Sequence, residues 1–270
     1  DVRTIREERA HLGLGEEILR HGRVRRAKLD EVADVTREFA RIARKLGVRE
    51  LETVVTAPGR QGDSPQRLLD AIGRATAGEV RVVSAEEEGR LAFAGAVSRA
   101  EPGDGVIAVC DVGGGSTEVV VGTDMLGPAW VRSVDLGSLR LTAALLPGDP
   151  PTSTEIDAAR AAVREAFAAV DPPRPDRALA TGGSARAVAR VVGHEYGLDD
   201  LERVVELLSG RTAAVSAAKL GVRPDRARTL LAGTLILAEV SRLLDVPFTP
   251  SRGGIREGVA LRLASRRIAA

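Results

Sequence analysis

The stretch Val106-Ile107-Ala108-Val109-Cys110-Asp111-Val112-Gly113-Gly114-Gly115-Ser116-Thr117-Glu118-Val119-Val120-Val121 decides the fold of this chain. In it, an apolar run ends at Asp111, three glycines and two hydroxyl side chains follow, and a second run rich in β-branched residues begins at Thr117. This order predicts a buried strand, a tight glycine turn and a second strand.

The composition of that turn is typical of a site for phosphate and metal. Glycines have no Cβ, so their backbone N–H groups can face an anion at close range, and Ser116 and Thr117 can donate further hydrogen bonds. Asp111, at the end of the strand, can hold a hard cation such as Mg²⁺ that bridges phosphate oxygens. The same residues would also suit a glycine hairpin that merely turns the chain, and the stretch alone leaves both readings open.

Length and charge limit the functions to consider. The 270 residues can bury one large core or two smaller ones, and a formal net charge of +1 gives no reason to expect binding to nucleic acid or to a membrane surface. The single cysteine excludes an internal disulfide and fits a reducing compartment, so we expect a cytoplasmic protein. No apolar run approaches the length of a membrane span, and no signal peptide is visible.

Upstream of the glycine turn, strand and helix patterns alternate. We expect an amphipathic helix over 29–46, strands over 51–56 and 79–83, a loop over 57–63 and a helix over 86–97. Such alternation is typical of an α/β domain.

Downstream, a second glycine turn follows the strand predicted at 177–180. Thr181-Gly182-Gly183-Ser184 leads from that strand into a helix that should reach about Tyr196. A helix N-terminus offers free N–H groups and a positive dipole end to an anion, so two such turns could grip a phosphorylated ligand. The alternative is that the glycines only permit close packing of the strand on the helix.

An acidic cluster, Glu86-Glu87-Glu88, opens the helix before the first turn. Ser84 and Glu87 have the spacing of a capping box, and glutamates favour a first helical turn through the helix dipole. Alternatively, one of the glutamates acts as a general base and orients water toward a phosphorus atom. The spacing does not choose between these roles.

Three further residue types carry weaker signals. The histidines His11, His21 and His194 are scattered and predict no zinc site. Cys110 ends a strand that we expect to be buried, so we assign it to the core. Arg60, in a loop after a strand, could clamp phosphate, but an isolated loop arginine is usually only solvated.

Together these pieces resemble the exopolyphosphatase and guanosine pentaphosphate phosphohydrolase (Ppx/GppA) phosphatase family, in its short two-domain branch. The stretches that carry the resemblance, in order along the chain, are Glu87-Glu88-Gly89-Arg90-Leu91, Asp111-Val112-Gly113-Gly114-Gly115-Ser116-Thr117-Glu118, Asp135-Leu136-Gly137-Ser138-Leu139-Arg140-Leu141-Thr142, Ala180-Thr181-Gly182-Gly183-Ser184-Ala185 and Ile255-Arg256-Glu257-Gly258. Each motif alone is weak, but the ordered set is specific and spans almost the whole chain.

The resemblance implies a two-lobed α/β fold of the actin-like ATPase group (acetate kinase, Hsp70 and actin; ribonuclease H-like), with the active site in the cleft between the lobes. The N-terminal lobe would then cover 1–110, completed by the C-terminal helix 255–270, and the C-terminal lobe would cover 111–254. The resemblance also implies a hydrolase that uses Mg²⁺ or another divalent cation. Its substrate would be inorganic polyphosphate or guanosine pentaphosphate, from which it releases the terminal phosphate.

The same resemblance implies roles for individual residues. Glu87, as the first glutamate of the Glu-Glu-x-Arg-Leu pattern, would be the catalytic base, with Glu86 as the alternative if the register shifts by one. Asp111 would organise the metal, with Glu118 as a helper. The phosphate-binding set would be Arg60, Gly113, Gly114, Gly115, Ser116, Gly182, Gly183 and Ser184.

The sequence departs from the family pattern in three places. The strand end before Arg60 reads Thr56-Ala57-Pro58-Gly59, where the family has Thr-Ser-Ala. No first phosphate loop of the Asp-x-Gly type precedes residue 111, so we expect either a truncated chain or a lost loop, with poor activity in the second case. The additional helical domain of longer relatives does not follow, so a long basic channel for polyphosphate is a weaker expectation.

Two other functions remain open. A small-molecule kinase of the same fold would consume ATP only when an acceptor is present, whereas a hydrolase releases phosphate from polyphosphate alone. A non-catalytic sensor would bind polyphosphate or a guanosine alarmone without turnover. For any of these, a homodimer is the default expectation, because dimers are the commonest symmetric assemblies.

Overall fold

The computed structural model describes residues 3–63 and 65–269, and its contacts divide the chain after Ala85. The first unit, Asp1–Ala85, holds a two-stranded sheet, and the second, Glu86–Ala270, holds a five-stranded sheet.

The first unit is built on two short parallel strands. Its elements are α1 (Leu14–His21), α2 (Arg26–Lys45), β1 (Thr53–Val55), α3 (Pro58–Gln61), α4 (Pro65–Thr76) and β2 (Val80–Val82). The helix predicted over 29–46 is confirmed as α2. The loop predicted over 57–63 was partly wrong, because one helical turn, α3, begins there at Pro58, whose fixed φ suits a first helical position.

The second unit is built on a mixed sheet in the order β5-β4-β3-β6-β7. Its strands are β3 (Ile107–Val112), β4 (Thr117–Thr123), β5 (Gly127–Val134), β6 (Arg177–Thr181) and β7 (Phe248–Pro250). Its helices are α5 (Ala85–Val97), α6 (Ser138–Leu145), α7 (Ser153–Phe167), α8 (Gly182–Val192), α9 (Leu198–Ser209), α10 (Ala213–Leu220), α11 (Pro224–Leu244) and α12 (Ile255–Ala269). Strand β4 is antiparallel to β3 and β5, whereas β6 is parallel to β3 and β7.

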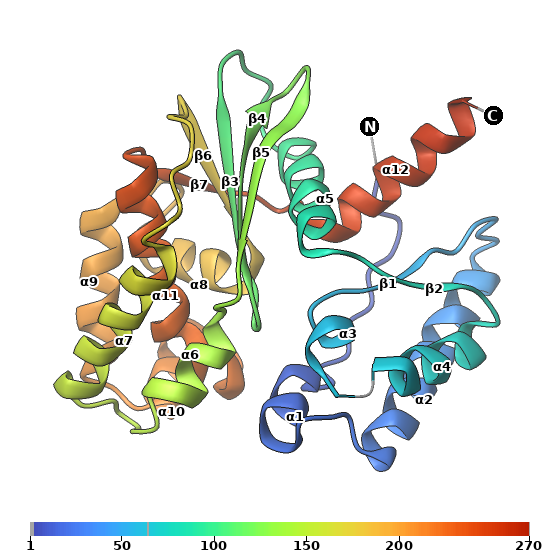
Figure 1. Cartoon of the computed structure of the whole chain (residues 1–270), viewed down its shortest axis with the longest axis horizontal. Helices are drawn as coiled ribbons and strands as arrows, with labels where there is room; N and C mark the ends of the chain where they lie inside the picture. The colour runs from blue at the N-terminus through green and yellow to red at the C-terminus, as the bar shows by residue number, and fades with distance from the viewer. Residues whose placement is uncertain (1–2, 64, 270) are drawn as a thin grey trace. The chain divides into compact units, whose positions relative to one another are not determined.

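The predicted strand, glycine turn and strand are confirmed by β3, the turn after it and β4. Every residue of β3 is buried, because helices cover both faces of the sheet. Figure 1 shows α5 on one side of the sheet and α7, α9 and α11 on the other. Side chains that alternate along β3 therefore enter two different cores: Ile107 and Val109 pack with Phe93 of α5, and Ala108 and Cys110 belong to the larger core. This explains the continuous apolar run in the sequence.

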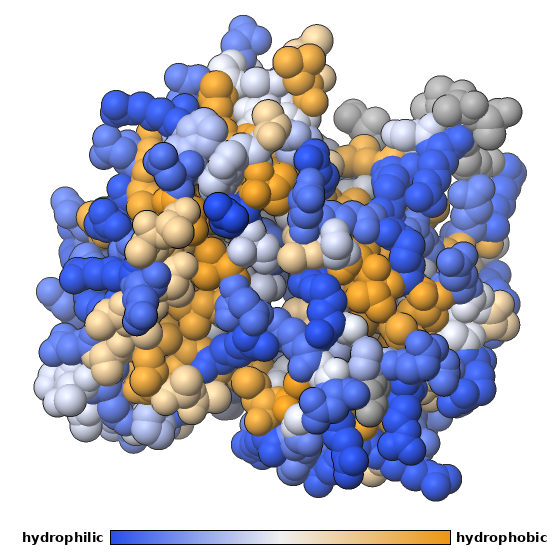
Figure 2. Space-filling model, in the orientation of Figure 1, coloured by the Kyte–Doolittle hydropathy of each residue, from blue (hydrophilic) through white to orange (hydrophobic). Residues whose placement is uncertain are grey.

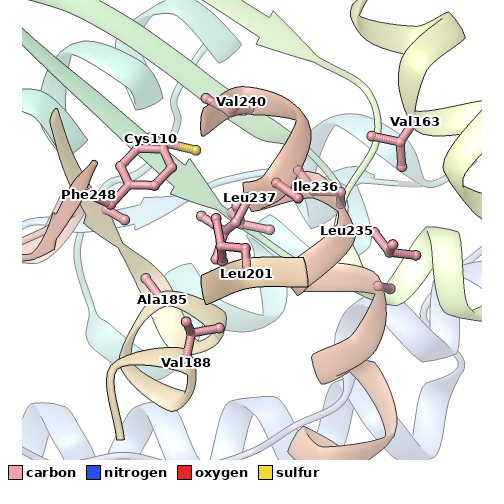
Figure 3. Close-up of a cluster of buried hydrophobic side chains, with 14 of the residues drawn as sticks. Cys110, Val163, Ala185, Val188, Leu201, Leu235, Ile236, Leu237, Val240 and Phe248 are labelled. Carbon is pink, nitrogen blue, oxygen red and sulfur yellow. The ribbon is translucent and has the colours of Figure 1, made fainter. Parts of the chain in front are cut away.

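Cys110 lies in the larger core, as predicted. Figure 3 shows it in the same cluster as Phe248, Leu237 and Val240. Burial raises the pKa of the Cys110 thiol well above its usual value, so the reactive thiolate form is disfavoured.

Helix α8 is shorter than the sequence predicted. It ends at Val192 instead of near Tyr196, because Gly193 takes a positive φ of 108° that ends the helix. The chain then becomes extended, and the backbone N–H of Tyr196 donates to the carbonyl of Phe248 at 3.1 Å, with the reverse bond at 2.9 Å. Tyr196 thus joins the edge of the sheet beside β7.

The division after Ala85 assigns α5 to the second unit, because Phe93 and Ala96 are buried against its sheet. Helix α12 also belongs to that unit. These contact units differ from the lobes predicted at 1–110 and 111–254, and that lobe division stays a prediction.

Glycines allow α5 and α12 to cross with their backbones in contact. A Cβ added at Gly95 would lie 1.8 Å from the carbonyl oxygen of Gly254, and one at Gly258 would lie 2.0 Å from the carbonyl oxygen of Leu91. Because the obstacles are backbone atoms, no side-chain rotation can make room.

We therefore expect Gly95→Ala to lower the free energy of unfolding by about 1–3 kcal/mol, the usual cost of overpacking. Urea unfolding followed by circular dichroism measures it. The matched control is Gly73→Ala in α4, where an added Cβ meets nothing closer than 3.6 Å, and the better helix propensity of alanine should leave stability equal or higher. Equal stability of Gly95→Ala and the wild type would contradict the close crossing.

The surface has mixed polarity. In Figure 2, hydrophilic and apolar side chains are interspersed over the face in view. Among the residues that the structure describes, no helix combines the length and apolarity needed to cross a membrane.

Candidate functional site

Asp111 lies where the two glycine turns meet. In the sheet register it is opposite Glu118 on β4 and opposite Thr181 on β6. The second turn comes so close that a Cβ added at Gly182 would lie 2.9 Å from a carboxylate oxygen of Asp111 and 3.1 Å from the carbonyl oxygen of Val112. Gly182 also has a positive φ of 92°, which residues with a side chain rarely adopt. Both the space and the backbone conformation therefore require glycine there.

The first glycine turn is fixed by a hydrogen bond within the turn and by hydrogen bonds from α6. The N–H of Gly113 donates to the carbonyl of Ser116 at 3.0 Å, which closes the turn. Ser138, the first residue of α6, donates to the carbonyl of Gly113 through its N–H at 2.9 Å and its hydroxyl at 3.1 Å. The carbonyl of Gly114 accepts from the N–H of Leu139 at 3.0 Å. The turn is therefore a fixed part of the fold and not a mobile loop tip.

The second turn forms the N-terminus of α8. Thr181 does not cap this helix, because its hydroxyl donates to the carbonyl of Gly253 at 2.6 Å. The hydroxyl of Ser184 is fully buried and makes no hydrogen bond to any part of the chain that the structure describes. The first N–H groups of α8 thus lie beside Asp111 without a side-chain cap, as an anion site requires.

Three buried carboxyl groups share this place. Glu88, Asp111 and Glu118 are 6%, 9% and 1% exposed. Burial, and next the charge of Glu88, raise the pKa of Asp111 to about 6, while Arg186 opposes the shift. Burial and the charges of Glu88 and Asp111 raise the pKa of Glu118 to about 8, against hydrogen bonds from Ser133 and Ser116. The first turn of α5 lies against β4 beside them, since a Cβ added at Gly89 would lie 3.6 Å from Cβ of Glu118.

The other two glutamates of the acidic cluster have different partners. Glu87 accepts a hydrogen bond from Nη1 of Arg262 at 2.5 Å, and Glu86 pairs with Arg90 at 2.9 Å with two thirds of its side chain exposed. Of the three glutamates, Glu88 is therefore the one grouped with Asp111 and Glu118. Glu88 lies four and eight residues before the buried Ala92 and Ala96, on the same face of α5. Glu87 precedes the buried Leu91 and Gly95 in the same way, so this spacing does not tell the two glutamates apart.

The donor set suits Mg²⁺. No group of three or more His, Cys, Asp and Glu side chains in the described part of the chain is arranged to hold a metal. Mg²⁺ in phosphate-transfer sites commonly takes only one or two carboxylates and completes its shell with water and phosphate oxygens. Asp111 and Glu118 are opposite each other in the sheet and supply buried oxygen donors. Their repulsion with each other and with Glu88 would be offset by a bound cation. The metal roles of both residues stay a prediction.

Two arginines that the sequence analysis missed border the second turn. Arg186 lies in α8 and lowers the pKa of Asp111. Arg226, at the start of α11, covers Gly183: a Cβ added there would lie 2.5 Å from the guanidinium carbon. Burial lowers the pKa of Arg226, and no hydrogen bond or ion pair fixes it within the part of the chain that the structure describes. A desolvated cation beside a helix N-terminus is suited to an anion.

Arg60 belongs to the first unit. Its Nη1 donates to the carbonyl of Val83 at 2.7 Å, so it links the segments that follow β1 and β2. Its phosphate role stays a prediction, as do those of the glycines and serines in the two turns.

The raised pKa values predict how stability depends on pH. A carboxyl group with a higher pKa in the folded state keeps its proton longer there, so its favourable contribution is complete below about pH 4. It is lost as the pH rises through about 6 for Asp111 and about 8 for Glu118. Each pKa unit is worth about 1.4 kcal/mol, so the loss should amount to a few kcal/mol.

Thermal melts of metal-free protein between pH 5 and 9 measure this effect. The melting temperature should fall as the pH rises, and Glu118→Gln should flatten the curve. A flat curve for the wild type would contradict the burial of these groups.

The comparisons with known proteins find relatives along most of the chain. A family model described as the Ppx/GppA phosphatase family matches residues 2–267. Exopolyphosphatase 1 of Mycobacterium tuberculosis is 30% identical over 271 residues, which cover 94% of this chain and 78% of that one. Exopolyphosphatase 2 of the same organism is 31% identical over 217 residues, which cover 72% and 67%.

The solved structure of an exopolyphosphatase from Cytophaga hutchinsonii superposes with a TM-score of 0.87 and covers 97% of this chain and 89% of that one. At 22% identity, this match establishes the fold alone. The prediction of a mixed α/β fold of the actin-like ATPase group is thereby confirmed.

Proposed function

The chain belongs to the Ppx/GppA phosphatase family, and on this premise we propose that it releases the terminal phosphate of inorganic polyphosphate or of guanosine pentaphosphate. The observation that carries the proposal is the group of three buried carboxylates, Glu88, Asp111 and Glu118, at the junction of two glycine turns. Both substrates end in the same phosphoanhydride group, and the two turns suit that group and not the rest of either molecule.

In the proposed reaction, the terminal phosphoryl group lies between the two turns. N–H groups of the first turn and of the α8 N-terminus bind its non-bridging oxygens. Glu88 takes the role of general base and orients water for in-line attack on phosphorus. A divalent cation held by Asp111 and Glu118 would supply charge neutralisation on the phosphate oxygens. We assign the base to Glu88 and not to Glu87 or Glu86, because Glu88 is the one of the three that is buried with Asp111 and Glu118.

The test is a phosphate-release assay with Mg²⁺ that offers long-chain polyphosphate and guanosine pentaphosphate side by side. Release from either substrate alone supports the hydrolase and identifies its preference. ATP consumption that requires an added small-molecule acceptor would point to a kinase of this fold. Tight binding of either compound without phosphate release would point to a sensor.

We expect Arg226→Gln to raise the KM for polyphosphate by roughly 10–100-fold, because a charged hydrogen bond contributes about 1.5–3 kcal/mol. The kcat should change less, since the N–H groups of both turns would still bind the transferred group. Steady-state phosphate release measures both constants. The matched control is Arg164→Gln, an exposed position on α7. An unchanged KM would remove Arg226 from the substrate site.

A further inference from the structure

We infer that Arg262 and Glu87 are positioning residues, which fix the first turn of α5 so that Glu88 keeps its place beside Asp111 and Glu118. This inference rests on the proposed function, since Glu88 is the base there. The contact that carries it is the ion pair between Arg262 of α12 and Glu87 of α5, at 2.5 Å.

The ion pair is the third step of a regular series between two antiparallel helical segments. Gly95 contacts Gly254, Leu91 contacts Gly258, and Glu87 pairs with Arg262. Each step moves four residues toward the N-terminus of α5 and four residues toward the C-terminus of α12, which is about one helical turn on each. The first two steps are backbone contacts made possible by glycine, and the third is the only one of the series made by charged side chains.

The opposite side of the same turn is fixed by the sheet. A Cβ added at Gly89 would lie 2.9 Å from Cγ1 of Val131, 3.1 Å from Cγ2 of Val120 and 3.6 Å from Cβ of Glu118. Glu88 is therefore held between two neighbours, Gly89 against the sheet and Glu87 against α12. A helix end lacks part of its backbone hydrogen bonds and frays easily, so side-chain contacts matter most in this turn.

The pair is partly withdrawn from water, with the Arg262 side chain 21% exposed and that of Glu87 31%. Its charges largely cancel, so Glu87 adds little further negative potential to the three carboxylates nearby. Removing only Arg262 would both release the turn and leave an uncompensated charge next to Glu88.

The experiment is a charge swap in the full chain, assayed by phosphate release. We expect Arg262→Met to lower kcat by roughly 10–100-fold, as small misplacements of a catalytic group do, with KM changed less than about twofold. Arg262→Lys should keep most of the activity. Glu87→Arg should lose activity, and the swap Glu87→Arg with Arg262→Glu should recover to within a few fold of the wild type.

A control variant and two contradicting outcomes complete the test of the Arg262–Glu87 pair. Arg266→Met, one turn further along α12 and exposed, should behave as the wild type. An Arg262→Met protein with unchanged kcat would overturn the inference, and so would a swap as inactive as Glu87→Arg alone, which is the result expected if Glu87 itself is the base. Circular dichroism shows whether each variant is folded, and the comparison of Glu87→Arg with the double swap carries the test if Arg262→Met is not. A wild type without phosphate release would overturn the proposed function and this inference with it.

Discussion

Glu88→Gln should lower the kcat for phosphate release by roughly 10²–10⁴-fold, the usual contribution of a general base. The amide keeps the shape of the side chain but cannot accept a proton from water. KM should change little, because the two glycine turns and Arg226 would still bind the substrate. Steady-state phosphate release at saturating Mg²⁺ measures both constants.

The same substitution should not weaken the fold. Glu88 adds to the repulsion that raises the pKa of Asp111 and Glu118, so its neutral replacement should leave the melting temperature of the metal-free protein equal or higher. Glu165→Gln, on the exposed face of α7, is the matched control and should be fully active. Near-normal turnover of Glu88→Gln would remove Glu88 from the mechanism, and a larger loss in Glu87→Gln than in Glu88→Gln would return the base role to Glu87.

Asp111→Asn should lower kcat/KM by at least about 100-fold at a fixed Mg²⁺ concentration. That factor corresponds to about 2.7 kcal/mol, within the several kcal/mol of charge stabilisation that a metal ion supplies to phosphoryl transfer. The amide lacks the negative charge that a hard cation needs, so the Mg²⁺ concentration for half-maximal activity should also rise. A Mg²⁺ titration of the initial rate measures this shift, and EDTA should abolish phosphate release by the wild type.

The control for this prediction is Asp157→Asn, an exposed aspartate on α7, which should show the wild-type Mg²⁺ dependence. Asp111→Asn should fold, since it replaces a buried group of raised pKa by a neutral one of the same size. An unchanged Mg²⁺ dependence of Asp111→Asn would place the metal elsewhere. Full activity of the wild type in EDTA would exclude a metal requirement altogether.

Much of the fold could be predicted from local sequence. The apolar run before Asp111 and the glycines after it define a buried strand and a tight turn, because a strand covered on both faces needs apolar residues at every position. The alternation of helix and strand signals defines the α/β class, and the amphipathic period of 29–46 defines α2. These features depend on side-chain chemistry and on spacing within one element.

The end of α8 and the turn α3 could not be predicted in the same way. Each depends on a few residues at an element boundary, where Gly193 and Pro58 decide the backbone conformation. Such boundaries are set by single dihedral angles and not by a repeating pattern.

Which side chains share the site was decided only by the tertiary structure. The sequence by itself determined the two glycine turns and the acidic cluster, because glycines and charged residues mark such places locally. It did not distinguish Glu88 from Glu87, which are adjacent in the chain but have different surroundings. Glu88 is buried and its charge acts on Asp111 and Glu118, whereas Glu87 pairs with Arg262, which lies far along the chain. Nor did it reveal Arg226 above Gly183. These partners come from distant segments, so only the pairing of strands and the crossing of helices brings them together.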